Sequence, residues 1–336
     1  MPGFQNLANL LYMNHIMSKT SLKKAEATFA KDVIKGLSAN PKSLPSKYFY
    51  DEKGDKLFQR IMRMPEYYLT DCEFEILDRH KEKFLQIFGS DHFELIELGA
   101  GDGMKTKLLL EHFVAQGADF SYCPIDISGH ILANLEADVH RRWPTLDIRP
   151  LRGDYFEMLD TMRRESAHRK VLLFMGANIG NMEVAAAKSF LAELRQHMDK
   201  EDLLVIGFDL KKDPQVILDA YNDAAGITAE FNLNLLYRIN RELGANFQLP
   251  QFKHWETYNP HTGAARSFLI SLQEQEVYFS DLDRYFSFAA WEPISVELSQ
   301  KFSLKEVEAM AAETGFERIQ HFQDKRSYFV DSVWRA

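Results

Sequence analysis

Phe93-Glu-Leu-Ile-Glu-Leu-Gly-Ala-Gly-Asp-Gly103 is the stretch that decides the fold of this chain. Leu95, Ile96 and Leu98 give it the apolar run of a short buried strand. The three glycines that follow allow the backbone to turn sharply and to approach a ligand closely. Because Lys105–Phe113 then has the pattern of a helix, the stretch predicts a strand, a cradling loop and a helix of the nucleotide-binding type.

Strand and helix patterns alternate along the middle of the chain. The predicted strands are 94–98, 121–127, 145–151, 171–175 and 203–208. Helical patterns such as 131–140 and 184–197 separate most of them. This alternation predicts an α/β, Rossmann-like fold with a parallel sheet. Near the C-terminus, Ser303-Leu-Lys-Glu306 is a capping box that begins a helix ending at Gly315, and 316–322 with 327–334 predicts a final hairpin.

The segments outside this alternation predict a discontinuous second domain. Helical patterns occupy 22–37, 56–64 and 73–88, with a breaker-rich loop at 40–46. Residues 211–247 are mostly helical in pattern, and 266–279 and 295–302 resemble strands. We therefore expect three parts: an N-terminal extension (1–20), a substrate-binding domain (21–75 plus 212–302) and a ligand-binding α/β domain (76–211 plus 303–336).

The overall composition narrows the class of protein. Of the 336 residues, 46% are hydrophobic and 26% are charged, as in soluble globular proteins. The net charge of −9 argues against a nucleic-acid partner, which requires a basic face. No apolar run reaches the roughly 18 residues of a membrane span. With only Cys72 and Cys123, no disulfide framework is indicated, so we expect the protein in the reducing cytoplasm. We also expect a monomer.

Two aspartates strengthen the prediction of a cofactor site around Gly99, Gly101 and Gly103. Asp126 ends the second predicted strand, where an acidic residue accepts hydrogen bonds from both hydroxyls of a ribose. Asp154 follows the third strand and is placed to meet an adenine amino group. Each feature also has a structural reading, because glycines serve any tight turn and aspartate is common in turns.

The pattern fits S-adenosylmethionine better than NAD or ATP. The loop is Gly-x-Gly-x-Gly rather than the dinucleotide fingerprint, and the glycine spacing before Lys105-Thr106 is wrong for a Walker loop. The closing hairpin is the feature of the methyltransferase version of this fold.

Several segments resemble the histidine-specific methyltransferase family of ergothioneine biosynthesis, over about residues 20–336. The block from Ala220-Tyr-Asn-Asp to Phe-Asn-Leu-Asn234 is highly specific, whereas the glycine loop is shared by methyltransferases of this class. The other matching segments are Leu44-Pro-Ser-Lys-Tyr-Phe-Tyr-Asp51, Met64-Pro-Glu-Tyr-Tyr68, Glu97-Leu-Gly-Ala-Gly-Asp-Gly103, Pro124-Ile-Asp-Ile-Ser128, Phe174-Met-Gly-Ala-Asn-Ile-Gly-Asn181 and Glu297-Leu-Ser-Gln-Lys-Phe302.

The resemblance implies three methyl transfers from S-adenosylmethionine to the α-nitrogen of histidine, which give hercynine. It implies that the cofactor is held by Gly99, Lys105, Asp126 and Asp154. It also implies that the amino-acid substrate is bound by Asn181 and Tyr221 at its carboxylate and amine, by Tyr50 near the amine, and by Tyr67, Glu297 and Ser299 around the imidazole. Of these, we expect Tyr50 and Asn181 to act closest to the reaction.

The substrate residues make chemical sense, although each also has a structural reading. In a strand, Glu297 and Ser299 share a face, and a carboxylate with a hydroxyl can serve the two nitrogens of an imidazole. The same two residues fit the solvent face of an edge strand. Tyrosines 50 and 67 fit core aromatics with a polar tip, and Asn181 fits a turn, although ligands in α/β sheets bind beyond the strand ends where Asn181 lies.

Two positions depart from the family pattern. Ala177-Asn178 stands where a Ser-Thr pair is more typical, and Ser267 stands where members often carry Met in the side-chain pocket. Both changes affect the preferred amino acid rather than the transfer chemistry.

Methyl transfer requires no metal, and no His-Glu-x-x-His pair is present among the 11 histidines.

Three alternative functions remain open from the sequence. The first is a relative that methylates another amino acid or a small amine. The second, from another class, is a non-catalytic regulatory protein that binds the cofactor. A nucleic-acid methyltransferase fits the acidic composition least.

Overall fold

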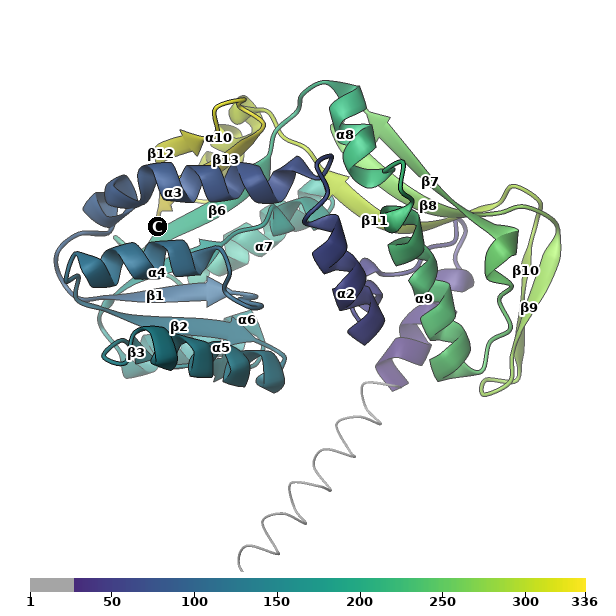
Figure 1. Ribbon diagram of the computed structural model, residues 1–336, viewed down its shortest axis with the longest axis horizontal. Coiled ribbons are helices and arrows are strands. Elements are labelled where there is room, and N and C mark those ends of the chain that lie inside the picture. Colours follow the sequence, from purple (N-terminus) through teal and green to yellow (C-terminus); the bar gives the residue numbers. More distant parts are fainter. Residues whose placement is uncertain (1–26) are drawn as a thin grey trace, which may run out of the picture. The chain divides into compact units, whose positions relative to one another are not determined.

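The computed structural model describes residues 27–336, which divide into two compact units (Figure 1). The sheet unit consists of Pro65–Ile217, Tyr258–Ala265 and Leu298–Ala336. The second unit consists of 27–64, Leu218–Thr257 and Arg266–Glu297. The predicted N-terminal extension, 1–20, lies outside the described residues, as does the beginning of the predicted helix 22–37, of which 27–37 is helical.

An eight-stranded sheet forms the centre of the sheet unit. Its strand order is β12-β13-β6-β5-β1-β2-β3, and β4 also pairs with β2. All pairings from β6 to β3 are parallel, whereas β13 is antiparallel to both β6 and β12. The strands are β1 (Phe93–Leu98), β2 (Phe120–Asp126), β3 (Asp147–Ile148), β4 (Leu151–Arg152), β5 (Arg169–Phe174), β6 (Leu203–Asp209), β12 (Glu317–Gln323) and β13 (Phe329–Arg335).

The Rossmann-like α/β prediction and its closing hairpin are therefore confirmed. One predicted strand was wrong in detail, because 145–151 contains only the short β3 and the first residue of β4. Pro150 separates the two and cannot donate to a ladder. The helix α6 was not predicted from the sequence.

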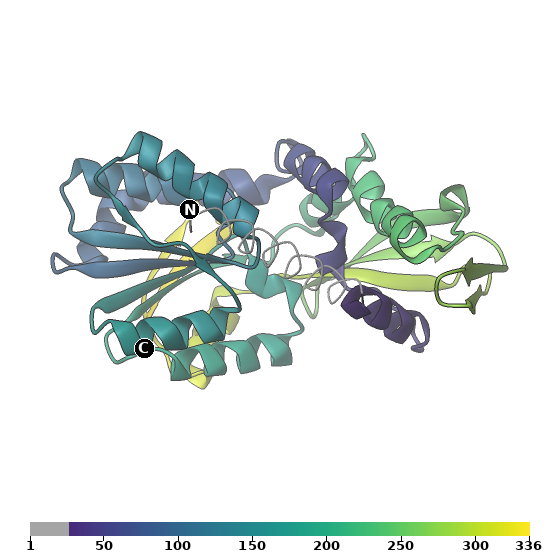
Figure 2. The same cartoon turned by 90° about the horizontal axis from the view of Figure 1, so that it is seen from below.

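Helices cover both faces of this sheet (Figure 2). On one face, Phe93 of β1 packs against Phe88 and Phe113, with ring centroids 5.7 and 6.3 Å away. On the other face, Ile96 and Leu98 belong to a core shared with α6, α7 and α10. The helices of the unit are α3 (Tyr68–Phe88), α4 (Thr106–Ala115), α5 (Gly129–Arg142), α6 (Tyr155–Glu165), α7 (Val184–Gln196) and α10 (Leu304–Glu313).

The alternation of β1 explains why one charged residue is buried in this core. Glu97 faces the same side as Phe93 and Leu95, where its carboxylate accepts from the hydroxyls of Thr106 (2.6 Å) and Tyr122.

The capping box at Ser303 and Glu306 is present as predicted, with the Ser303 N–H donating to Glu306 Oε2 at 2.6 Å. Cys123 lies buried in β2, and it and Cys72 are free thiols.

The second unit combines helices with two small sheets. The helices α2 (Glu52–Ile61) and α9 (Ile227–Leu243) lie side by side, and Phe49 and Phe231 pack between them with centroids 4.9 Å apart. Asp51 caps α2 through the Gly54 N–H (2.8 Å) and also accepts from Asn234 of α9 (2.8 Å). The remaining elements are α8 (Pro214–Tyr221), β7 (Phe252–Asn259), β8 (Ala264–Ser271), β9 (Gln275–Phe279), β10 (Arg284–Phe288) and β11 (Pro293–Gln300).

The strand prediction for this region was incomplete. Residues 266–279 do not form one strand, because β8 ends at Ser271 and β9 begins at Gln275 in a different sheet. β11, β8 and β7 form one sheet, and β9 pairs with β10 in another. The sequence analysis did not identify β7 or β10.

Candidate functional site

The glycine loop follows the carboxyl end of β1. Gly99 has φ of 73° and Gly101 has φ of 55°, a left-handed conformation that favours glycine. A Cβ at Gly99 would lie 2.7 Å from the Tyr155 hydroxyl, whereas a Cβ at Gly101 would meet nothing within 4 Å. The loop therefore combines a tight turn with open space beside Gly101, as the close approach of a ligand requires.

Asp126 joins this loop to the end of the neighbouring strand β2. Its Oδ2 accepts from the Gly101 N–H at 3.3 Å, and its Oδ1 accepts from the Ser128 N–H at 2.8 Å. A carboxylate offers about four acceptor positions, so two remain for the hydroxyls of a ribose. The remaining acceptor positions of Asp126, at the carboxyl end of β2, therefore fit the ribose of an adenosyl cofactor.

Asp154 is exposed at the N-terminus of α6. Its Oδ1 accepts from the Phe156 N–H at 3.0 Å, which makes it the N-cap of that helix. The structure therefore gives Asp154 a capping role in α6, and a contact with an adenine amino group stays a prediction.

Lys105 connects the glycine loop to the loop that follows β5. Its ammonium pairs with Glu73, whose side chain is fully buried and whose Oε1 accepts from the Gly176 N–H at 2.7 Å. Asp331 of β13 lies next to this pair. Burial, and then the charge of Glu73, raises the pKa of Asp331 well above its ordinary value, which favours its protonated form. The cluster thus fixes Lys105 beside the cofactor loop.

Asn181 lies exposed at the end of a short 3-10 helix, η2 (Asn178–Asn181), after β5. This helix packs closely on the end of β11, because a Cβ at Gly180 would lie 2.8 Å from the Gln300 carbonyl oxygen. Asn178 uses its amide differently and donates to the Met175 carbonyl at 2.8 Å. Asn181 is therefore held beyond the carboxyl ends of the strands, where ligands bind in such sheets.

Two further predicted substrate residues belong to the sheet unit. Tyr67 is half-buried and immediately precedes α3. Ser299 is 7% exposed, and its hydroxyl accepts a hydrogen bond from the Lys301 ammonium at 2.7 Å. Because Gly180 contacts Gln300, the structure brings the strand of Ser299 next to the helix of Asn181.

The second unit holds Tyr50, Tyr221 and Glu297. The Tyr50 ring packs edge-on against Phe58 (5.4 Å) and Phe231 (5.6 Å). Although 45% of Tyr50 is exposed, loss of water around the phenol raises its pKa, and the charge of Glu297 adds to the effect. Tyr50 therefore stays a neutral phenol near neutral pH, which suits positioning by hydrogen bonds rather than proton abstraction.

Tyr221 is buried at the end of α8, in the block that resembles the family most specifically. Its carbonyl accepts from His254 Nε2 at 2.9 Å, which fixes the proton on that nitrogen. Asp223 then accepts from the N–H groups of Ile227 and Thr228, both at 2.8 Å, and so orders the start of α9. The segment around Tyr221 is therefore rigidly held within its unit.

Ser267, one of the two departures from the family pattern, lies between two carboxylates. It is 1% exposed, and its hydroxyl donates to Glu256 Oε2 at 2.6 Å. Glu297 Oε2 lies 3.5 Å from the same hydroxyl. Ser267 thus forms a polar link to Glu256, next to the predicted imidazole ligand Glu297.

Comparison with known proteins decides the family. A family model described as histidine-specific, S-adenosylmethionine-dependent methyltransferase matches residues 29–336. This chain belongs to that family. The methyltransferase is 35% identical over 305 residues to the histidine N-alpha-methyltransferase of Mycolicibacterium smegmatis, covering 91% of this chain and 94% of that one.

Two further relatives agree with this result. The methyltransferase is 35% identical to the histidine N-alpha-methyltransferase of Mycobacterium tuberculosis, covering 89% of this chain and 92% of that one. It is 29% identical to the ergothioneine biosynthesis protein 1 of Schizosaccharomyces pombe, covering 87% of this chain and 39% of that one. The enzyme class and the dependence on S-adenosylmethionine, both predicted from the sequence, are therefore confirmed, and the family implies a small amino-acid substrate.

Within residues 27–336, no helix is long and apolar enough to cross a membrane, and no group of three His, Cys, Asp or Glu residues is arranged to hold a metal ion.

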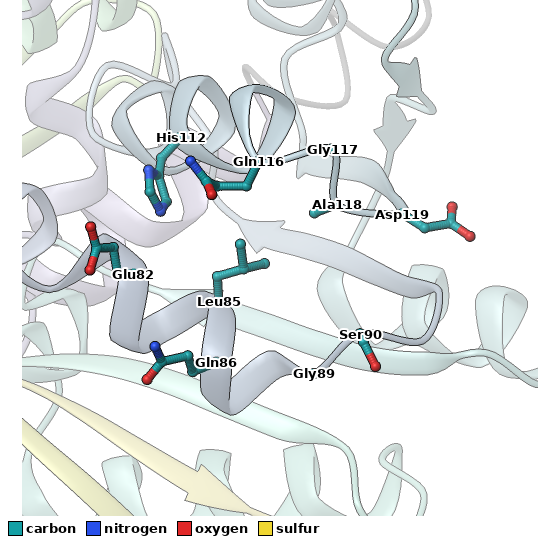
Figure 3. Close-up of a pocket in the computed structure, with 10 residues that line it drawn as sticks. All are labelled: Glu82, Leu85, Gln86, Gly89, Ser90, His112, Gln116, Gly117, Ala118 and Asp119. Carbon is teal, nitrogen blue, oxygen red and sulfur yellow. The ribbon is translucent and has the colours of Figure 1, made fainter.

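A groove of about 870 Å³ lies at the amino ends of β1 and β2, opposite the glycine loop (Figure 3). Residues before each strand line it, including Gly89, Ser90, Ala118 and Asp119, so it is not the cofactor site.

The methyltransferase carries a testable pH signature at Glu97. Burial raises its pKa from 4.5 to about 7, although Thr106 and Tyr122 oppose the shift. Because the folded protein holds this proton to a higher pH than the unfolded chain, the free energy of unfolding falls as pH rises from about 4.5 to about 7. The glutamine of Glu97→Gln does not ionise. The free energy of unfolding of this variant, relative to that of the wild type, should therefore rise by about 3 kcal/mol across that range. Denaturant unfolding between pH 4 and pH 8 measures the difference, and a difference that does not change with pH would contradict the assignment.

Sequence reasoning missed three charged residues of the site. Glu73 falls inside a helical pattern, and its burial beside Lys105 has no local signal. Glu256 had a signal, because β7 alternates buried and exposed residues and places a carboxylate on the buried face. Lys301 had no signal, because a lysine near the end of a strand is ordinarily exposed, yet its side chain is fully buried.

Proposed function

We propose that this enzyme transfers three methyl groups from S-adenosylmethionine to the α-nitrogen of L-histidine and produces hercynine, a step of ergothioneine biosynthesis. The observation that carries the proposal is the family match over residues 29–336, which spans both units. Relatives named histidine N-alpha-methyltransferase support the nitrogen, and a relative named ergothioneine biosynthesis protein 1 supports the pathway.

We assign the cofactor to the carboxyl ends of β1 and β2 in the large sheet. Asp126 would accept from the ribose hydroxyls, the backbone of the loop at Gly99 and Gly101 would pass close to the cofactor, and Asp154 would meet the adenine. Lys105 would add a fixed positive charge, because Glu73 holds its ammonium in place. The left-handed loop, the open space at Gly101 and the unused acceptor positions of Asp126 support this placement.

We assign the substrate to residues of both units. Asn181 and Tyr221 would bind the α-carboxylate and the amine, and Tyr50 would orient the amine. Glu297 would accept from the imidazole N–H, while Ser299 and Tyr67 would border the rest of the ring. The exposure of Asn181 beyond the strand ends and the common strand face of Glu297 and Ser299 support these roles.

The chemistry is an in-line displacement. The bound cofactor supplies an electrophilic methyl group on a sulfonium. The neutral amine must face it at roughly 3 Å, and holding that geometry supplies most of the rate. The amine therefore loses a proton before each transfer. Tyr50 is a poor base because its pKa is raised, so we assign it to orientation and expect the proton to leave through water.

Product analysis tests the proposal directly. Purified enzyme with S-adenosylmethionine and Nα,Nα-dimethylhistidine should yield a product one methyl group heavier, with all three methyl groups on the α-nitrogen in fragment spectra. Methylation of a ring nitrogen instead would overturn the proposed position.

A change at Glu297 tests the imidazole assignment. Glu297→Ala removes the proposed acceptor for the ring N–H, so kcat/KM for histidine should fall by about tenfold to a hundredfold. Rates with amino acids that lack this N–H should change much less. Glu292→Ala, on a residue paired with Lys42, is a matched control for loss of a carboxylate in the same unit. An unchanged selectivity profile would return Glu297 to a purely structural role.

A different amino acid or small amine is the second candidate substrate. It is favoured by Ser267, which places a hydroxyl and Glu256 where the family often carries an apolar Met. A panel of amino acids separates the two candidates, because the mass of the methylated product identifies the substrate. We further propose that the enzyme works as a monomer in the cytoplasm.

A further inference from the structure

Glu73 of α3 links the glycine loop to the segment 175–182, here called the Asn181 loop. Its side chain is fully buried, its Oε1 accepts from the Gly176 N–H at 2.7 Å, and its Oε2 pairs with the Lys105 ammonium. Lys105 is the N-cap residue of α4, directly after the glycine loop, whereas Gly176 lies between β5 and the short helix that ends at Asn181. One buried carboxylate therefore holds two loops that come from different parts of the chain.

Two glycines make room for this arrangement. The helix α3 packs across β6 and β13 (Figure 1). A Cβ at Gly207 of β6 would lie 2.7 Å from Glu73 Oε1, and a Cβ at Gly176 would lie 3.4 Å from Lys105 Nζ. The carboxylate of Glu73 thus occupies the space that a side chain at position 207 would take. Glu73 is therefore placed by close packing as well as by its hydrogen bonds.

Asp331 of β13 is a second buried carboxyl group beside Glu73. It pairs in register with Gly207, and within residues 27–336 neither of its carboxyl oxygens has a hydrogen-bond donor. An ionised carboxylate can only accept, so burial without a donor disfavours it, whereas a protonated carboxyl donates its own O–H. Glu73 is the hydrogen-bonding neighbour of Asp331. The two carboxyl groups therefore share one proton, and Lys105 balances the single charge that remains.

We propose that Glu73 is a positioning residue that fixes the glycine loop and the Asn181 loop to each other, and that Asp331 is a neutral acid that holds Glu73 in place. The proposal rests on the proposed function, in which Lys105 meets the cofactor and Asn181 meets the amino acid. Because both carboxyl side chains are fully buried, they act through Lys105 and Gly176 rather than by contact with either ligand. A change at Glu73 should therefore alter the binding of both ligands.

The variant Glu73→Gln tests the link to both ligands. It keeps the size of the side chain but removes the charge that holds the Lys105 ammonium. The affinity for S-adenosylhomocysteine in titration calorimetry, and kcat/KM for histidine at saturating cofactor, should each fall by at least about tenfold. A purely structural role would lower only the melting temperature, so a folded variant with wild-type values of both would overturn the inference.

The matched control is Glu94→Gln. Glu94 is a buried glutamate at the amino end of β1 in the same unit, and its Oε1 lies 3.8 Å from Arg149. Because it lies at the other end of the strand from the glycine loop, its variant should keep both values within about threefold of wild type. Equal losses in Glu73→Gln and Glu94→Gln would contradict a specific role for Glu73.

A second background assigns the cofactor effect to Lys105. If Glu73 acts on the cofactor through this ammonium, Glu73→Gln should cause a further loss of less than about threefold in affinity for S-adenosylhomocysteine when Lys105→Met is already present. A further loss as large as that in the wild-type background would overturn this route. The double variant Glu73→Gln with Asp331→Asn prevents Asp331 from ionising in place of Glu73, and wild-type affinity in it would also contradict the proposal.

Infrared absorption tests the proton on Asp331. At pH 8, above the pKa of about 7 of Glu97, the spectrum of the wild type minus that of Asp331→Asn should contain the C=O band of a protonated carboxyl group. The asparagine amide can donate to Glu73 in its place, so the affinity for S-adenosylhomocysteine should stay within about threefold of wild type. A difference spectrum with only carboxylate bands would overturn the neutral acid.

The calorimetric and infrared measurements require no turnover. A wild-type enzyme that binds S-adenosylhomocysteine but does not methylate histidine would overturn the proposed function. Unchanged affinity for S-adenosylhomocysteine in Glu73→Gln would instead overturn the inference, whatever the substrate.

Discussion

Asn181→Ala lowers kcat/KM for histidine methylation by at least about a hundredfold while cofactor affinity changes less than about threefold. This is the expected result because the asparagine would hold the amino-acid end of the substrate, and a misplacement of about 1 Å at the reacting amine costs about a hundredfold. The cofactor would lie on other elements, namely the glycine loop and the end of β2. Calorimetric titration with S-adenosylhomocysteine and a steady-state assay separate the two effects.

Asn178→Ala is the matched control for this variant. Asn178 belongs to the same short helix, but its amide donates to the Met175 carbonyl within the loop. It should retain more than about a tenth of the wild-type kcat/KM, since loss of a neutral hydrogen bond costs about 1 kcal/mol. Equal losses in the two variants would show that the helix matters only as a whole, and full activity of Asn181→Ala would refute the placement of the substrate.

Asp126→Ala should weaken S-adenosylmethionine binding by about a hundredfold or more. Hydrogen bonds to a charged group contribute about 1.5–3 kcal/mol each, and the proposed ribose contact contains two of them. The variant also loses the bonds from the Gly101 and Ser128 N–H groups that hold the loop against β2. Cofactor affinity measured by titration calorimetry gives the result directly.

Asp102→Ala provides the comparison within the same loop. Its carboxylate is exposed and accepts from the Met104 N–H at 3.0 Å, so it has a local role in the turn. We expect its cofactor affinity to stay within about fivefold of wild type, as for the loss of one hydrogen bond. A cofactor affinity of Asp126→Ala equal to that of Asp102→Ala would contradict the ribose assignment.

The sheet unit was predictable from the sequence because its signals are local. The parallel strands are short apolar runs, a glycine turn at Gly99 marks the end of β1, and a capping box at Ser303 marks the start of α10. The short β3 and β4 were not separable, because two-residue strands have no periodicity of their own. The prediction of one strand over 266–279 was wrong because it ran across the four polar residues 273–276, where β8 has ended and β9 begins.

The candidate site was predictable only where chemistry follows a strand end. Asp126 is the last residue of β2 and Asn181 ends the short helix that follows β5, and the family resemblance added the tyrosines, Glu297 and Ser299. The buried partners depend on distant pairings that sequence spacing does not reveal: Glu73 contacts Lys105, and Asp209 contacts Lys301. Ser267 was identified as a departure, but its link to Glu256 required the pairing of neighbouring strands.

A panel assay with the purified enzyme tests the central claim most directly. S-adenosylmethionine is offered with each common amino acid in turn, and mass spectrometry records the product. The proposed function predicts one dominant product, histidine heavier by three methyl groups, with the monomethyl and dimethyl forms also accepted as substrates. A trimethylated product from another amino acid, with histidine left unchanged, would contradict it.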